Sequence, residues 1–227
     1  MTLSPDHKVV MTLVDIHTHL PGNRNAVLSV NPTDFSPEPG QFYSVGWHPW
    51  ELPPLDAAHL DILANAAHHP QVIALGETGL DSLRGGSMQL QQQWLEAHIS
   101  LAEDVGKPLV VHLVRSAATL IALWRKTQPH HVPLVVHGMR SNAHVARMLL
   151  DEGFYLSFGW RFNPAALLIT PEERLLIETD DDPTHSIHSV ATIVAAARNT
   201  HQEDITNTAA VNVKRLLRDV SKVMQGF

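Results

Sequence analysis

The chain has 227 residues, of which 44% are hydrophobic, and it carries a formal net charge of −7 at pH 7. This length suits a single domain over residues 1–227, and the hydrophobic content is sufficient to bury a full core. The sequence contains no cysteine, which excludes disulfides, a cysteine nucleophile and thiolate metal sites, and its acidic balance argues against a general electrostatic grip on nucleic acid.

Short apolar runs alternate with longer helical patterns along the chain. The predicted strands are residues 9–16, 26–30, 42–46, 72–75, 109–111, 134–136, 155–158 and 175–177. The predicted helices are residues 56–68, 88–105, 117–127, 143–152, 187–199 and 205–224. Apolar strands that alternate with helices are typical of parallel strands buried on both faces. We therefore expect an α/β fold with a TIM-like (β/α) barrel, and a doubly wound open sheet is the structural alternative.

The first two connections between strands are irregular. Residues 19–26 leave room for a loop but not for a helix, and residues 31–41 contain three prolines and a glycine, which indicates a loop. The helices of the first crossovers are therefore missing, and we expect a barrel that is trimmed or distorted near its first three strands.

Imidazoles and carboxylates end five of the predicted strands. His17 and His19 are two residues apart at the end of the first strand, so on an extended chain they point to the same face. Later strands are followed in turn by Glu77, His112, His137 and Asp180. The C-terminal ends of the strands surround one mouth in α/β barrels, and catalytic residues collect there. We therefore expect these six side chains to hold one or two divalent ions.

The residue types indicate the chemistry of such a centre. Imidazole with carboxylate suits Zn, Mn, Fe or Ni, and carboxylate-rich sites accept Mg. A divalent ion lowers the pKa of coordinated water to about 7, so the expected reaction is hydrolysis. Glu77 lies midway through the ligand series and is the better bridge between two ions. Asp180 follows the last strand and is expected to be both a terminal ligand and the general base.

At these residues the chain resembles the TatD family of metal-dependent hydrolases, within the amidohydrolase superfamily. The resemblance runs in order through Val14-Asp15-Ile16-His17-Thr18-His19, Val45-Gly46-Trp47-His48-Pro49-Trp50, Ala74-Leu75-Gly76-Glu77-Thr78-Gly79-Leu80-Asp81, Lys107-Pro108-Leu109-Val110-Val111-His112, Val136-His137-Gly138, Gly153-Phe154-Tyr155-Leu156-Ser157-Phe158-Gly159 and Leu176-Ile177-Glu178-Thr179-Asp180. It implies a TIM-like barrel with two metals. His17, His19 and Asp180 would hold one metal, His112 and His137 the other, and Glu77 would be shared. Family members include deoxyribonucleases, commonly 3′ exonucleases, so the resemblance implies a phosphodiester substrate.

The chain departs from the family pattern in segments that would contact a substrate. Val114 stands where an arginine is common, with Arg115 one residue later, and Met139-Arg140-Ser141 replaces the usual Phe-Ser-Gly. Arg115 and Arg140 are candidates for clamping a phosphate, with pairing to a surface acid as the alternative. His48 is a candidate phosphate contact or a structural residue. Trp47 and Trp50 could stack on a base, although packing beneath the loop is the favoured interpretation.

Hydrolysis of a DNA phosphodiester, with two divalent ions (Zn, Mg or Mn), is the leading hypothesis. Hydrolysis of an ester, amide or lactone, including aminoacyl-tRNA deacylation, is the alternative on the same centre, and a non-catalytic metal-binding protein is a third interpretation. DNA or an oligonucleotide is the expected partner, with no membrane and no obligate protein partner. Residues 1–10 lack the apolar core of a signal peptide, so a cytoplasmic location is expected.

Overall fold

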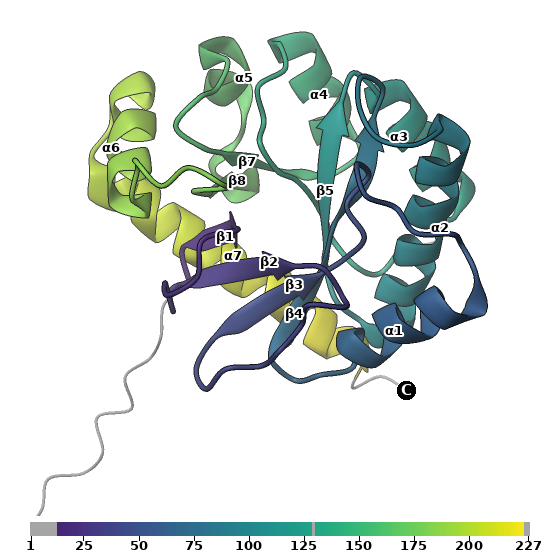
Figure 1. Ribbon diagram of the computed structural model, residues 1–227. Coiled ribbons are helices and arrows are strands. Elements are labelled where there is room, and N and C mark those ends of the chain that lie inside the picture. The colour runs from purple at the N-terminus through teal and green to yellow at the C-terminus, as the bar shows by residue number, and fades with distance from the viewer. Residues whose placement is uncertain (1–12, 129, 225–227) are drawn as a thin grey trace, which may run out of the picture.

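The computed structural model describes residues 13–128 and 130–224. Eight parallel strands close into a barrel in which each strand pairs with its neighbours in chain order (Figure 1). The strands are β1 Asp15–Thr18, β2 Ala26–Val30, β3 Phe42–Val45, β4 Val72–Asp81, β5 Leu109–Val114, β6 Leu134–Val136, β7 Tyr155–Phe158 and β8 Leu175–Ile177. The barrel closes between its first and last strands, where Asp15 of β1 is in register with Ile177 of β8. The predicted TIM-like barrel is confirmed.

Helices cover the outside of the barrel from β3 onward (Figure 1). They are α1 Ala57–Ala67, α2 Met88–Val105, α3 Ala117–Lys126, α4 Ala143–Asp151, α5 Pro164–Ile169, the 3₁₀ helix η1 Glu172–Arg174, α6 Ile187–Arg198 and α7 Gln202–Met224. Among the described residues, the β1–β2 and β2–β3 connections contain no helix, as the sequence predicts. No helix in the described part of the chain is both long and apolar enough to cross a membrane.

Helix α7 covers one end of the barrel. It passes behind strands β1 to β4 in Figure 1. Val213 and Leu216 of this helix belong to a buried cluster that also contains a side chain from almost every strand. The strand members of that cluster are Ile16, Val27, Ala74, Val110, Val135, Tyr155 and Leu176. A second, larger cluster lies between the strands and the outer helices. The interior is therefore packed at this end, and the opposite end, where the strands finish, is left for the site.

Most boundaries lie where the sequence predicts them, and the differences have local causes. Strand β4 continues to Asp81, six residues past its expected end, so Glu77 lies inside the strand. Helix α5, residues 164–169, was not expected; its start is stabilised by the Asn163 side chain, which accepts hydrogen bonds from the backbone amides of Ala165 and Ala166. The first strand was expected over residues 9–16. It covers Asp15–Thr18, so residues 13 and 14 precede it, and residues 9–12 lie outside the described residues.

Candidate metal centre

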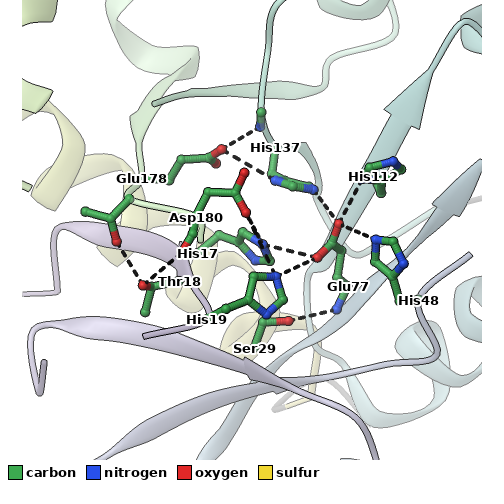
Figure 2. Close-up of polar contacts among 12 residues, drawn as sticks. His17, Thr18, His19, Ser29, His48, Glu77, His112, His137, Glu178 and Asp180 are labelled. Atoms are coloured by element: carbon green, nitrogen blue, oxygen red, sulfur yellow. Dashed lines mark hydrogen bonds and ion pairs between the residues drawn. The ribbon is translucent and has the colours of Figure 1, made fainter. Parts of the chain in front are cut away.

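The Glu77 carboxylate lies at the centre of a ring of imidazoles at the C-terminal mouth of the barrel (Figure 2). The side chain is buried, with the residue only 4% exposed. Five histidines have a ring nitrogen within 3.3 Å of one of its oxygens: His17, His19, His48, His112 and His137. All six predicted ligands are brought together, because Asp180 lies on the rim of the same group.

The ring has two halves, one on each carboxylate oxygen. Oε1 faces Nε2 of His48 at 3.0 Å, Nδ1 of His112 at 2.9 Å and Nε2 of His137 at 2.7 Å. Oε2 faces Nε2 of His19 at 3.0 Å and Nε2 of His17 at 3.3 Å. On this second side, Oδ1 of Asp180 lies 3.7 Å from His17 and 3.9 Å from His19. The Glu77 carboxylate therefore presents a separate group of possible metal-binding side chains on each of its two oxygens.

Backbone pairing between the first and last strands places His17, His19 and Asp180. The amide of Asp180 donates to the carbonyl of His17 at 3.0 Å, and the amide of His19 donates to the carbonyl of Asp180 at 2.9 Å. Asp180 adopts a left-handed conformation with φ 55°, which turns the chain out of the barrel just after β8. The geometry that closes the barrel thus also holds both predicted ligands of the first strand beside the acid of the last.

Two buried carboxylates lie behind two of the three imidazoles that face Glu77 Oε1. Oδ2 of Asp81 lies 3.3 Å from Nε2 of His112, and Oε1 of Glu178 lies 3.4 Å from Nδ1 of His137. Glu178 is fixed by accepting a hydrogen bond from the amide of Gly138 at 2.6 Å. Carboxylates behind metal-binding histidines orient the ring and select the tautomer whose lone pair faces the metal.

Neither backing carboxylate is among the predicted site residues, although the sequence contains a signal for both. Asp81 lies four residues after Glu77 in an extended strand, and Glu178 lies two residues before Asp180. Both spacings place a pair of acids on one face.

A third buried carboxylate, that of Asp15, supports the chain between β8 and Asp180. It accepts hydrogen bonds from the Thr179 hydroxyl at 2.7 Å and the Thr179 amide at 3.1 Å. Burial raises the pKa of Asp15 to about 7, and the hydrogen bonds from Thr179 limit this rise.

The ionisable groups of the centre shift the pKa values of one another, some upward and some downward. Burial opposes ionisation of Glu77, but the charge of His137 and the surrounding imidazole hydrogen bonds outweigh it and hold the Glu77 pKa well below its usual value. Burial favours the neutral form of His137, yet the carboxylates of Glu77 and Glu178 raise the His137 pKa well above 6.5. His17 has a lowered pKa because it is fully buried and lies beside His137. Glu77 is thus ionised and His17 is neutral, which are the forms that bind metals, whereas a metal at His137 would have to displace the proton that this ring holds.

Unsatisfied polar atoms test whether the centre fits a metal. Within the described residues, both ring nitrogens of the fully buried His17 lack a hydrogen-bond partner. Leaving a buried polar group unpaired is costly, and a cation would use the lone pair of such a nitrogen. Three overlapping groups of side chains in this region have the spacing to hold an ion: His17, His19 and Glu77; His17, His137 and Asp180; His48, Glu77 and His112. The residues present therefore fit divalent metals.

A cavity of about 470 Å³ opens over the centre, and all three predicted substrate contacts line it. Arg115 and Arg140 are exposed on its wall, and Nη2 of Arg140 lies 3.7 Å from Oδ2 of Asp180. His48 reaches deeper, to the Glu77 carboxylate. Of the two tryptophans, Trp47 is buried in the core, whereas Trp50 is 39% exposed and lines the cavity.

Comparison with known proteins identifies the family of the chain. The family model for TatD related DNases matches residues 8–218 of the chain. The chain belongs to this family. TatD-family proteins named among its relatives are metal-dependent hydrolases, and so is this chain.

Relatives of the TatD-family chain come from several bacteria. It is 27% identical over 198 residues to the uncharacterized metal-dependent hydrolase YabD of Bacillus subtilis. The matched region covers 78% of this chain and 77% of YabD. It is 36% identical over 120 residues to the 3'-5' ssDNA/RNA exonuclease TatD of Edwardsiella piscicida, covering 49% of this chain and 46% of that protein. The crystal structure of YJJV, a TatD homolog from Escherichia coli K12, superposes with a TM-score of 0.77 at 19% identity, over 92% of this chain and 98% of that one. This last similarity shows a shared fold.

Proposed function

We propose that this TatD-family hydrolase removes nucleotides from the 3′ end of DNA, acting on single strands or short oligonucleotides with two divalent ions in the centre. The observation that carries the proposal is the two-sided arrangement around Glu77, whose oxygens face separate groups of imidazoles. Two arginines on the cavity wall offer contacts to phosphate. The name of the Edwardsiella relative, a 3'-5' ssDNA/RNA exonuclease, supports a nucleic-acid substrate.

The proposed ligands divide along the two oxygens of Glu77. His17, His19 and Asp180 would hold one ion, His112 and His137 would hold the other, and Glu77 would be shared between them. Zn, Mn and Mg are all compatible with such a set of imidazoles and carboxylates. When bound, divalent ions supply an acidified water and polarise the bond under attack.

The protein side chains orient the substrate and move the proton. Arg115 and Arg140 bind phosphate oxygens, since a guanidinium donates two parallel hydrogen bonds to such a group. His48, whose Nε2 lies on the same side as His112, contacts the phosphate that is attacked. The water oxygen bonds to phosphorus while the bond to the 3′ oxygen of the preceding nucleotide breaks. Asp180 accepts the proton and returns it to that oxygen, which leaves a 5′-mononucleotide and a shorter chain with a 3′ hydroxyl.

Elemental analysis of the purified protein, paired with digestion of 3′-labelled single-stranded DNA in Mg, Mn and Zn, tests the proposal. We expect stoichiometric metal and stepwise release of nucleotides. Asp180→Asn should lower the rate by at least about a hundredfold, because it removes the base, and His17→Ala should lose both metal and activity. Asp61→Asn, at an exposed position of α1, is the matched control and should retain the rate.

Two outcomes would contradict different parts of the proposal. Bound metal without nucleotide release would reject the nuclease and leave the hydrolase of esters, amides or lactones. Absence of metal after reloading would reject the assigned centre itself. The cytoplasmic location and the absence of an obligate protein partner stay predictions, which cell fractionation and size-exclusion chromatography would check.

A further inference from the structure

A second cavity of about 350 Å³ adjoins the metal centre on the side of β2 and β3. We call it the β2–β3 pocket. It continues past the metal centre to Ser29 and Asn31 at the end of β2, and to Gly46 after β3. The residues that it shares with the main cavity are His19, His48, Trp50, Glu77 and Asp181. Its volume falls within the range of small-molecule sites. The centre is therefore reached from two sides, with Glu77 and His48 between them.

The two sides differ in charge. Arg115 and Arg140 line the main cavity only. Among the described residues that line the β2–β3 pocket there is no lysine or arginine. Its exposed carboxylates belong to Glu51, which lines this pocket alone, and to Asp181, which lines both cavities. A phosphate group is thus favoured in the main cavity and disfavoured in the β2–β3 pocket, since like charges at close range repel.

Trp50 forms a fixed aromatic wall where the two cavities meet. Its indole Nε1 donates to Oδ2 of Asp81 at 2.7 Å, and the guanidinium of Arg84 lies 3.6 Å from its ring centroid. These contacts hold the ring in one orientation although it is 39% exposed. A fixed, exposed aromatic ring beside a neutral or acidic pocket provides contact surface for the uncharged part of a nucleotide.

A DNA strand undergoing removal of its last nucleotide has a matching asymmetry. On one side of the attacked phosphate lies the rest of the strand, with a negative charge at every linkage. On the other side lies only the terminal nucleoside, which ends in a neutral 3′ hydroxyl.

We propose that the β2–β3 pocket receives the 3′-terminal nucleoside, while Arg115 and Arg140 hold the phosphates of the preceding nucleotides. This inference rests on the proposed function. It assigns the enzyme a requirement for a 3′ end without a phosphate, because a terminal phosphate would face Glu51 with no arginine or lysine in the pocket to offset the repulsion.

The test compares two oligonucleotides of the same sequence, one ending in a 3′ hydroxyl and one in a 3′ phosphate. We expect kcat/KM to be at least about tenfold higher for the hydroxyl end, because the Glu51 carboxylate would face a terminal phosphate dianion. Glu51→Gln should reduce this ratio several-fold. The matched control is Glu38→Gln, which makes the same change in the β2–β3 connection at an exposed glutamate that lines neither cavity, and it should keep the ratio of the wild type.

Inhibition by products gives a second readout that is independent of the cleavage rate. A 5′-mononucleotide should inhibit more strongly than the corresponding nucleoside 3′,5′-bisphosphate, and Glu51→Gln should narrow the difference. Equal cleavage of both ends, or equal effects of Glu51→Gln and Glu38→Gln, would overturn the inference while the nuclease stands. Release of nucleotides from neither end would instead reject the proposed function.

Discussion

Individual side chains around Glu77 show how the centre is held ready for metal. The two imidazoles that are backed by a carboxylate turn different nitrogens toward Glu77 Oε1. His112 turns its Nδ1 and His137 its Nε2. The backing acids account for this difference, because Asp81 lies beside Nε2 of one ring and Glu178 beside Nδ1 of the other. Ring orientation is therefore set by buried carboxylates that do not themselves face Glu77.

Removing one backing acid should weaken metal binding without removing a ligand. We expect Glu178→Ala to lower the affinity for a divalent ion about 10- to 100-fold, because His137 loses the group that fixes its tautomer. Glu178→Gln should lose less, since its amide oxygen can still accept from Gly138. Competition with a chromophoric chelator at constant pH measures the effect, with the exposed Glu203→Ala as control. An unchanged affinity in a folded Glu178→Ala protein would show that Glu178 has no positioning role.

At the scale of elements, strand β4 is longer than the predicted strand, residues 72–75, because two of its glycines lie within the strand. Gly76 and Gly79 suggest that the strand ends at Leu75, because glycine weakens a strand and favours turns. In the structure these glycines instead mark close approach to β5. A Cβ at Gly79 would lie 2.0 Å from the carbonyl oxygen of His112, and a Cβ at Gly76 would lie 2.2 Å from that of Val110. The strand therefore continues to Asp81, and this brings Asp81 beside His112.

Gly79→Ala should consequently distort the β4–β5 pairing. We expect a loss of roughly 2 to 4 kcal/mol in the free energy of unfolding, since Gly79 has φ +143° and the added methyl meets backbone. Metal affinity should fall as well, because His112 must move. Urea unfolding of the metal-free protein gives the first quantity. In Gly86→Ala, the matched control, the nearest heavy atom to the added Cβ is Leu90 Cδ2 at 3.9 Å, and an equal loss in both variants would refute the explanation.

Across the whole molecule, a buried histidine joins α2 to the segment after β3. His98 is fully buried; its Nδ1 donates to the Trp94 carbonyl at 2.7 Å, and its Nε2 accepts from the Trp47 amide at 3.1 Å. Burial lowers the pKa of His98 to about 4, although the hydrogen bond to Trp94 opposes the shift. Because this imidazole is neutral in the folded protein, the free energy of unfolding depends on pH.

The sign of this dependence follows from proton binding. Between pH 6.5 and about 4 the unfolded chain protonates His98 and the folded chain does not, so acid favours unfolding in this range. The contribution lost on going from pH 7 to about pH 4 is about 3 kcal/mol, and nothing is lost above pH 7. His98→Asn, although less stable at pH 7, should show a shallower decline in unfolding free energy. Urea unfolding at pH 7.5, 6 and 5 measures both slopes, and identical slopes would disprove the role of His98.

The sequence by itself determined the barrel and predicted which side chains gather at its mouth. Apolar strands alternating with helices imply parallel pairing, and parallel strands bring their C-terminal ends to one mouth, so ligands placed at strand ends must meet there. The missing first crossover helices were also visible, because chain length limits what a segment can form. Helix α5 was not found, since six residues give too weak a pattern and its stability comes from the Asn163 cap and from packing.

Only the tertiary structure decided how these residues are used. Sequence spacing fixes the strand end and the face of a side chain, but ring rotation depends on partners distant in the chain, such as Glu178 for His137 and Asp81 for Trp50 and His112. The convergence of His48 on Glu77 and the β2–β3 pocket likewise arise from closure of the barrel. The periodicity of a sequence predicts local geometry. The protonation of a side chain, the tautomer of a histidine and the shape of a cavity depend instead on distances between segments that are remote in the chain.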